Sequence, residues 1–200
     1  MAAFESAIRT FALAGDAMHV NNARYMMAAT AAESGLQTRQ ALRWVEDCAT
    51  YARATGNIHE LAHALFTRAS LFPQPRTDPD LEGAVETFRA VGDLRCLARS
   101  QLLMAADAGP TEQVGFLEAA LDVARKAHDL EHQCVALEQL VGSHWASGDR
   151  RAAAVALGAL VNLVGHDRAT ARCPVAMLDD LDDLSSVVAE GQAHALRPTW

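Results

Sequence analysis

The chain has 200 residues, half of them hydrophobic and only 6% aromatic, and its formal net charge is −8 at pH 7. This composition excludes a disordered chain, and the negative charge opposes non-specific binding to nucleic acid, which needs a positive field. The sequence shows no signal peptide, no apolar stretch of membrane-spanning length and no C-x-x-C pair among its 4 cysteines. We therefore expect a reduced cytoplasmic protein with no membrane or nucleic-acid partner.

Helical patterns follow one another along the whole chain, and no segment alternates as a strand does. We expect helices at residues 3–14, 16–34, 37–55, 57–72, 79–91, 93–108, 111–127, 129–147, 149–164 and 174–192. Proline-rich residues 73–80 interrupt the series, and Pro110 marks a further boundary. The sequence thus predicts an all-α fold.

Four turns of similar sequence indicate an internal repeat. They end at Asp16, Asn57, Asp93 and Asp129, at intervals of roughly 36 to 41 residues. A glycine before the Asp or Asn can end one helix in the left-handed conformation, and the Asp or Asn can cap the next helix. His128 replaces this glycine in the fourth copy, where we expect a less sharp turn.

Small residues recur at fixed distances from these turns and favour close contacts between helices. The recurring positions are Ala7, Cys48, Ala84 and Ala120 before the turns, and Ala62, Ala98 and Cys134 after them. We assign repeats to residues 1–165 and a capping helix and tail, in the same domain, to residues 166–200. In the capping helix Leu178, Leu181, Leu184 and Val188 share one side, opposite the aspartates of residues 179–183. An acidic docking segment is the alternative interpretation of those aspartates.

Two stretches resemble tetratricopeptide (TPR) repeats. Residues 143–160, SHWASGDRRAAAVALGAL, resemble the middle of a TPR unit, and residues 84–105, AVETFRAVGDLRCLARSQLLMA, are similar to the C-terminal repeats of large bacterial multidomain transcriptional regulators. The resemblance implies an α-solenoid of about five antiparallel helix pairs in a right-handed superhelix. It also implies a non-enzymatic scaffold that binds a protein or peptide. The alternative is a ligand-sensing segment of such a regulator.

Residues 59–63 spell H-E-x-x-H, the signature of zinc peptidases. His59 and His63 lie one helical turn apart, so they can face one metal ion, and Glu60 would be the general base. A zinc metallopeptidase is therefore a third hypothesis. Zinc needs a third protein ligand, for which Glu82 and Glu86 are the downstream candidates, and the repeat already accounts for Glu82.

The repeat also accounts for the two histidines, because His59 aligns with Arg95 and His63 with Arg99 on a polar face. We therefore expect no catalytic residue, no bound metal and no cofactor.

The same polar face is the expected binding surface. In TPR proteins the first helix of each pair lines a groove, which corresponds here to 16–34, 57–72, 93–108 and 129–147. The expected groove residues are Asn22, Tyr25, His59, His63, Phe66, Arg95, Arg99 and Glu138. The histidines and arginines form a basic stripe on an acidic protein, so the expected partner is a protein or peptide with acidic groups.

Overall fold

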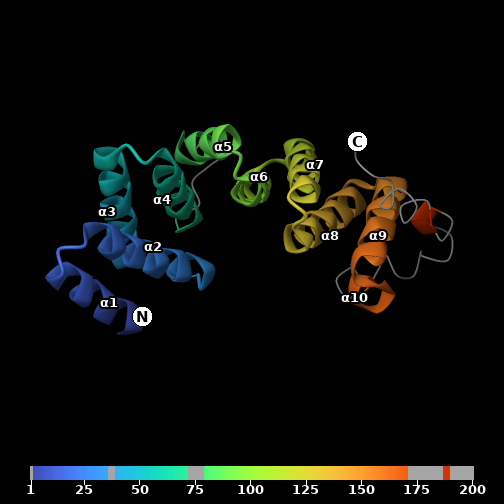
Figure 1. Ribbon diagram of the computed structural model, residues 1–200. Helices are drawn as coiled ribbons and strands as arrows, with labels where there is room; N and C mark the ends of the chain where they lie inside the picture. Colours follow the sequence, from blue (N-terminus) through green and yellow to red (C-terminus); the bar gives the residue numbers. More distant parts are fainter. Residues whose placement is uncertain (1, 36–38, 72–78, 171–186, 190–200) are drawn as a thin grey trace. The chain divides into compact units, whose positions relative to one another are not determined.

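A computed structural model describes residues 2–35, 39–71, 79–170 and 187–189, and these ranges contain helices and no strand (Figure 1). The helices are α1 (Ala2–Leu13), α2 (Ala17–Glu33), α3 (Arg39–Thr55), α4 (Ile58–Leu71), α5 (Pro79–Val91), α6 (Leu94–Asp107), α7 (Pro110–Lys126), α8 (Leu130–Ser147), α9 (Arg150–Val164) and α10 (His166–Thr170). The predicted all-α fold is confirmed for the described part of the chain. Within it, no helix is both long enough and apolar enough to span a bilayer.

The helices α1 to α9 lie close to the positions expected from the sequence, whereas α10 was not predicted. The expected capping helix, with its leucines and aspartates, falls outside the described residues except at its end. There, residues 187–189 are helical. Val188 packs against a hydrophobic core formed by α6 to α10.

The contacts divide the chain into two compact units, Met1–Asp93 and Leu94–Trp200. The assignment of repeats to residues 1–165 and of a capping helix and tail to 166–200, in the same domain, stays a prediction. Ala169 of α10 is buried in the same core as α7, α8 and α9. Within each unit every helix packs against its neighbours in sequence. In addition, α2 contacts α4 in the first unit and α6 contacts α8 in the second, so even-numbered helices lie side by side within a unit.

Five turns share one hydrogen-bonded geometry. A residue with positive φ ends the helix: Gly15, Gly56, Gly92, His128 and Gly148. The next N–H, from Asp16, Asn57, Asp93, Asp129 or Asp149, donates to the carbonyl five residues back at 2.9 Å in every case. This is the Schellman ending of a helix. His128 adopts φ 53° and its turn keeps the same bond, so the less sharp turn expected there is not observed.

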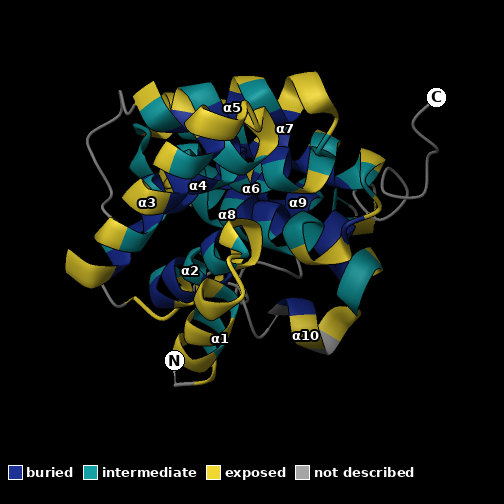
Figure 2. Ribbon diagram, turned by 60° about the vertical axis from the view of Figure 1, so that its left-hand side comes forward, coloured by how far each residue is buried: buried dark blue, intermediate teal, exposed yellow. Residues whose placement is uncertain are grey.

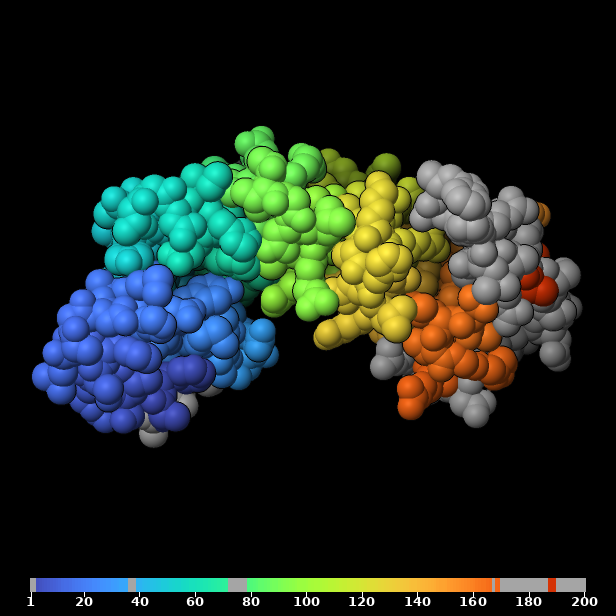
Figure 3. Space-filling model, in the orientation of Figure 1, coloured from blue at the N-terminus to red at the C-terminus, as the bar shows by residue number. Residues whose placement is uncertain are grey.

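Alanine dominates the contacts between helices. The recurring positions Ala62, Ala84, Ala98, Ala120 and Cys48 are all buried, whereas Ala7 and Cys134 are half-buried. Figure 2 shows that single helices carry both buried and exposed positions. The helices α1 and α2 contact each other and are drawn in neighbouring shades of blue in Figure 3. Small side chains therefore let neighbouring helices approach closely, as the recurrence predicted.

We predict that Ala98→Phe destabilises the protein by about 1–3 kcal/mol, because the fully buried methyl group leaves no room for a ring. The measurement is the free energy of unfolding in urea. Ala106→Phe is the matched control, since Ala106 lies on the same helix but is exposed. Equal stability of the two variants would show that position 98 is not a close helix contact.

Cys48 is the buried cysteine of the first unit. Its thiol is 3% exposed and donates a hydrogen bond to the carbonyl of Asn21 at 3.4 Å. Burial raises the pKa of the Cys48 thiol to about 12, and Asp47 and Glu60 add to the effect while Arg24 opposes it. The thiolate is therefore almost absent at neutral pH.

We predict that Cys48 resists alkylation in the folded protein at pH 8 and reacts once the chain is unfolded, because the thiolate is the nucleophile. Mass spectrometry of peptides from briefly alkylated protein measures this. Cys96 and Cys134, which are half-buried and unbridged, should react faster. Labelling of Cys48 at the same rate as these two would contradict its burial.

Candidate functional site

His59, His63 and Asp93 converge on one point in the first unit. The Nε2 atom of His59 lies 2.8 Å from Oδ2 of Asp93, and the Nε2 atom of His63 lies 3.8 Å from the same oxygen. A possible ligand atom from each of the three residues lies within 4.8 Å of the others. The three side chains thus form a group of metal-ligand type, here called the His–His–Asp cluster.

Aromatic rings surround the two imidazoles. The ring of Phe88, which is fully buried, lies with its centroid 5.0 Å from that of His63 and 6.1 Å from that of His59. On the other side the hydroxyl of Tyr25 lies 3.4 Å from Nδ1 of His63. These contacts hold His63 between α2 and α5, with its Nε2 atom directed at Asp93.

The local sequence explains how the cluster forms. His59 and His63 are four residues apart on α4, so their rings lie on one face with centroids 4.6 Å apart. Asp93 follows Gly92, whose φ of 75° reverses the chain after α5. The Asp93 N–H is fixed to the carbonyl of Phe88. Phe88, whose ring lies against the imidazoles, therefore also accepts the backbone hydrogen bond that holds Asp93 in place.

Sequence reasoning did not find Asp93 as the partner of the histidines. Asp93 was interpreted only as a helix cap, and Glu82 and Glu86 were considered as third ligands; both are exposed on α5. No local sequence signal marks the contact of Asp93 with the histidines, but the structure contains a second contact of the same kind. Arg95, which aligns with His59, makes the equivalent contact with Asp129, the Asp of the following turn.

Asp129 organises the corresponding position of the second unit. Its carboxylate lies 3.1 Å from Nε of Arg95 and 2.8 Å from Nδ1 of His132, and it also accepts the His132 N–H at 3.2 Å. Burial raises the pKa of Asp129, but the hydrogen bonds from His132 and the charges of His132 and Arg95 outweigh it and lower the pKa overall. Asp129 thus caps α8 and also forms an ion pair with Arg95 of α6.

Glu60 does not belong to the His–His–Asp cluster. One of its carboxylate oxygens, Oε2, is buried, and no hydrogen-bond partner for it is found among the described residues. Its charge acts on the thiol of Cys48 in α3, whereas the two histidines lie against Phe88 in α5. Glu60 is also absent from the group of ligand atoms that His59, His63 and Asp93 form.

The expected groove residues fall into both units. Tyr25, His59 and His63 lie together in the first, where Asn22 is exposed and Phe66 half-buried. In the second unit the exposed Arg95 meets Asp129, and Arg99 is half-buried. Because Asp93 and Asp129 lie against His59 and Arg95, the expected basic stripe contains carboxylates at two of its positions.

Glu138 lines an open pocket of about 650 Å³ on the second unit. Its other lining residues are Leu130, Glu131, Cys134, Val135, Val164 and Arg168. Leu130 is 62% exposed, which is unusual for a leucine at a helix start. The expected residue Glu138 is therefore part of a surface hollow, although its neighbours there were not predicted.

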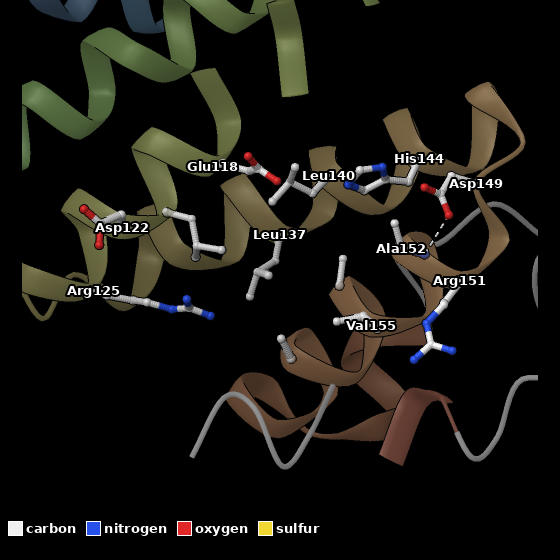
Figure 4. A pocket seen from close by; sticks show the side chains of 13 residues that line it. Glu118, Asp122, Arg125, Leu137, Leu140, His144, Asp149, Arg151, Ala152 and Val155 are labelled. Carbon is white, nitrogen blue, oxygen red and sulfur yellow. Dashed lines mark hydrogen bonds between the residues drawn. The ribbon is translucent and has the colours of Figure 1, made fainter. Parts of the chain in front are cut away.

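A second pocket, of about 540 Å³, opens on α7, α8 and α9. Its floor is apolar and its edges are charged (Figure 4); the lining includes Leu121, Leu137, Leu140, Val155, Ala156 and Ala159, with Glu118, Asp122, Arg125, His144, Asp149 and Arg151. Arg125 and Arg151 lie at opposite ends of this row of side chains. None of these residues was expected at a binding site.

Comparison with known proteins gives no relative: no family model, no curated protein and no solved structure matches the chain. Function is therefore inferred from these sites alone.

We predict that Asp129→Asn lowers the free energy of unfolding by about 1–2 kcal/mol near pH 6, because a charged acceptor is lost from a buried position. The folded-state pKa of Asp129 is depressed, so its contribution is present above the unfolded value and is lost as the pH falls through the folded value. The difference between the variant and the wild type should therefore shrink as the pH falls below about 4.

Urea unfolding at several pH values measures this difference. Asp122→Asn is the control, because Asp122 is exposed and pairs with Lys126 on the same helix, where such a pair contributes little. A difference that is independent of pH, or equal in the two variants, would contradict the role of the Asp129 charge.

Proposed function

We propose that the chain is a non-enzymatic scaffold that binds an amphipathic peptide segment of a protein partner. The observation that carries the proposal is the pocket on α7, α8 and α9, where an apolar floor lies between charged ends. Such a surface suits a segment with apolar side chains on one face and charges at its borders. Its volume of about 540 Å³ lies within the range of known ligand-binding pockets.

The charges at the pocket favour acidic groups on the partner. Asp122 is paired with Lys126 at 2.7 Å, and Asp149 caps α9 by accepting the N–H of Ala152 at 3.0 Å. Arg125 and Arg151 lie at the two ends of the pocket, where positive charge can meet the carboxylates of a partner segment. An arginine can bind a carboxylate through two parallel hydrogen bonds.

The scaffold in this proposal is a TPR-like solenoid of antiparallel helix pairs. Support comes from the recurring Schellman turns, the buried small residues at repeating positions, and the contacts of α2 with α4 and of α6 with α8. In a solenoid each pair buries its apolar face only against its neighbours, so grooves between pairs are available to partners. The described cysteines Cys48, Cys96 and Cys134 are unbridged, which supports a cytoplasmic location.

We predict that peptides selected from a random display library on the immobilised full chain combine apolar residues with Asp or Glu. The affinity of a selected peptide should fall at least tenfold in Val155→Asp, because the floor becomes charged, and about tenfold in Arg125→Glu, with a weaker effect at high salt. Fluorescence anisotropy of the labelled peptide measures these changes.

The control variants are Val123→Asp and Arg43→Glu. Val123 is a half-buried valine of α7 outside the pocket, and Arg43 is an exposed arginine of α3. Both should bind the peptide as the wild type does. Peptides that bind all four variants equally, or no enrichment of any peptide on the wild type, would refute binding at this pocket.

A further inference from the structure

We propose that the His–His–Asp cluster binds a divalent transition-metal ion, with zinc as the ion that best fits the ligands. The ligand atoms are Nε2 of His59, Nε2 of His63 and a carboxylate oxygen of Asp93. Two imidazoles and one carboxylate are a ligand set typical of zinc sites that keep a fourth position for water. The proposal concerns a different unit of the chain from the peptide-binding pocket and does not depend on it.

The distances in the cluster are close to those that a metal requires. Around a tetrahedral ion with bonds of about 2.0–2.2 Å, neighbouring ligand atoms lie about 3.3 Å apart. The observed separations from Oδ2 of Asp93 are 2.8 Å to His59 and 3.8 Å to His63, on either side of this value. The ligand atoms of the two imidazoles lie within 4.8 Å of each other. Changes in side-chain torsion that move them together by up to about 1.5 Å would bring both nitrogens and the oxygen to bonding distance.

The surroundings orient His63 for this role. A ligating histidine normally fixes its second ring nitrogen to a hydrogen-bond partner. The hydroxyl of Tyr25 lies 3.4 Å from Nδ1 of His63, and with Nδ1 protonated and donating to that oxygen, the lone pair of Nε2 faces Asp93. The buried ring of Phe88 makes edge-type aromatic contacts with both imidazoles. The side chains of His63 and Asp93 are only 24% and 22% exposed, so the cluster is partly shielded from water.

Comparison with the corresponding residues of the second unit shows which contacts are specific to the His–His–Asp cluster. Arg95 and Asp129 make a contact of the same kind as His59 and Asp93. A polar contact between the start of one helix and the turn after the following helix therefore occurs in both units. Arg95 cannot ligate a metal because its guanidinium has no free lone pair at neutral pH. The additional His63, one turn beyond His59 and directed at the same carboxylate oxygen, has Arg99 as its counterpart. Among the described residues, two nitrogen ligands thus combine with a turn aspartate in the first unit alone.

The ligand chemistry distinguishes between classes of cation. Imidazole nitrogens suit Zn²⁺ and its neighbours in the first transition row, whereas Mg²⁺ and Ca²⁺ prefer sites built entirely of oxygen. The ion would connect α4 to the end of α5 and so fix the turn that follows α5. The carboxylate of Glu60 lies outside the group and is not among the proposed ligands.

The test is a titration of the full chain, purified without a polyhistidine tag and freed of metal by a chelator, with Zn²⁺ in a calorimeter. We expect saturable binding of one equivalent, an increase in Tm with Zn²⁺, and no response to Mg²⁺. His63→Ala and Asp93→Asn should each weaken the Zn²⁺ affinity at least tenfold and abolish the increase in Tm. Asn is favoured before a helix as Asp is, so Asp93→Asn should remain folded. Tyr25→Phe should weaken the affinity by about tenfold, because His63 loses its orienting partner.

His132→Ala is the matched control, because His132 makes an equally short contact of 2.8 Å with an aspartate but has no second histidine beside it. Its Zn²⁺ affinity should equal that of the wild type. Absence of saturable Zn²⁺ binding by the wild type would overturn the proposal. Wild-type affinity in folded His63→Ala and Asp93→Asn would overturn it too, because the ion would then bind elsewhere.

Discussion

One backbone hydrogen bond determines the arrangement of the helices: the N–H of the Asp or Asn after each left-handed residue donates to the carbonyl five residues back, at 2.9 Å in all five turns. This bond satisfies a carbonyl that the end of the helix leaves without a partner. It also fixes the direction in which the chain leaves. The side chain of the same residue then caps the next helix, as Asp16, Asn57, Asp129 and Asp149 do. Successive helices are thus joined by short turns, and within each unit the helices so joined pack against each other.

The aspartates of two turns also connect the turn to the second helix before it, Asp93 to α4 and Asp129 to α6. Asp93 and Asp129 are held in place by their own backbone bonds, and they meet His59 and Arg95 respectively. Because the carboxylate position is fixed by the fold, the chemistry at each turn depends on which side chain faces it. An arginine there gives an ion pair, whereas two histidines give the proposed metal site. The fold therefore supplies a repeated anchor, and the residues of each copy determine what the anchor can bind.

The positions of α1 to α9 could be predicted because their signals are local: Gly followed by Asp or Asn, a periodic apolar face, and proline at breaks. The burial of Ala98 and Cys48 followed from recurrence alone. The His–His–Asp cluster could not be predicted, because the H-E-x-x-H letters are local but Asp93 reaches them only through the contact of α4 with α5. The pocket on α7, α8 and α9 was missed for the same reason, since its floor and its two ends come from three different helices.

The measurement that tests this account most directly is hydrogen exchange of the backbone amides by NMR. The amides of Asp16, Asn57, Asp93, Asp129 and Asp149 should exchange at least about tenfold more slowly than those of Ile58, Leu94 and Leu130. The latter three occupy the first position of a helix, where the N–H has no partner within the helix. Equal exchange in the two sets would show that the turns are open loops, and the shared anchor would then not exist.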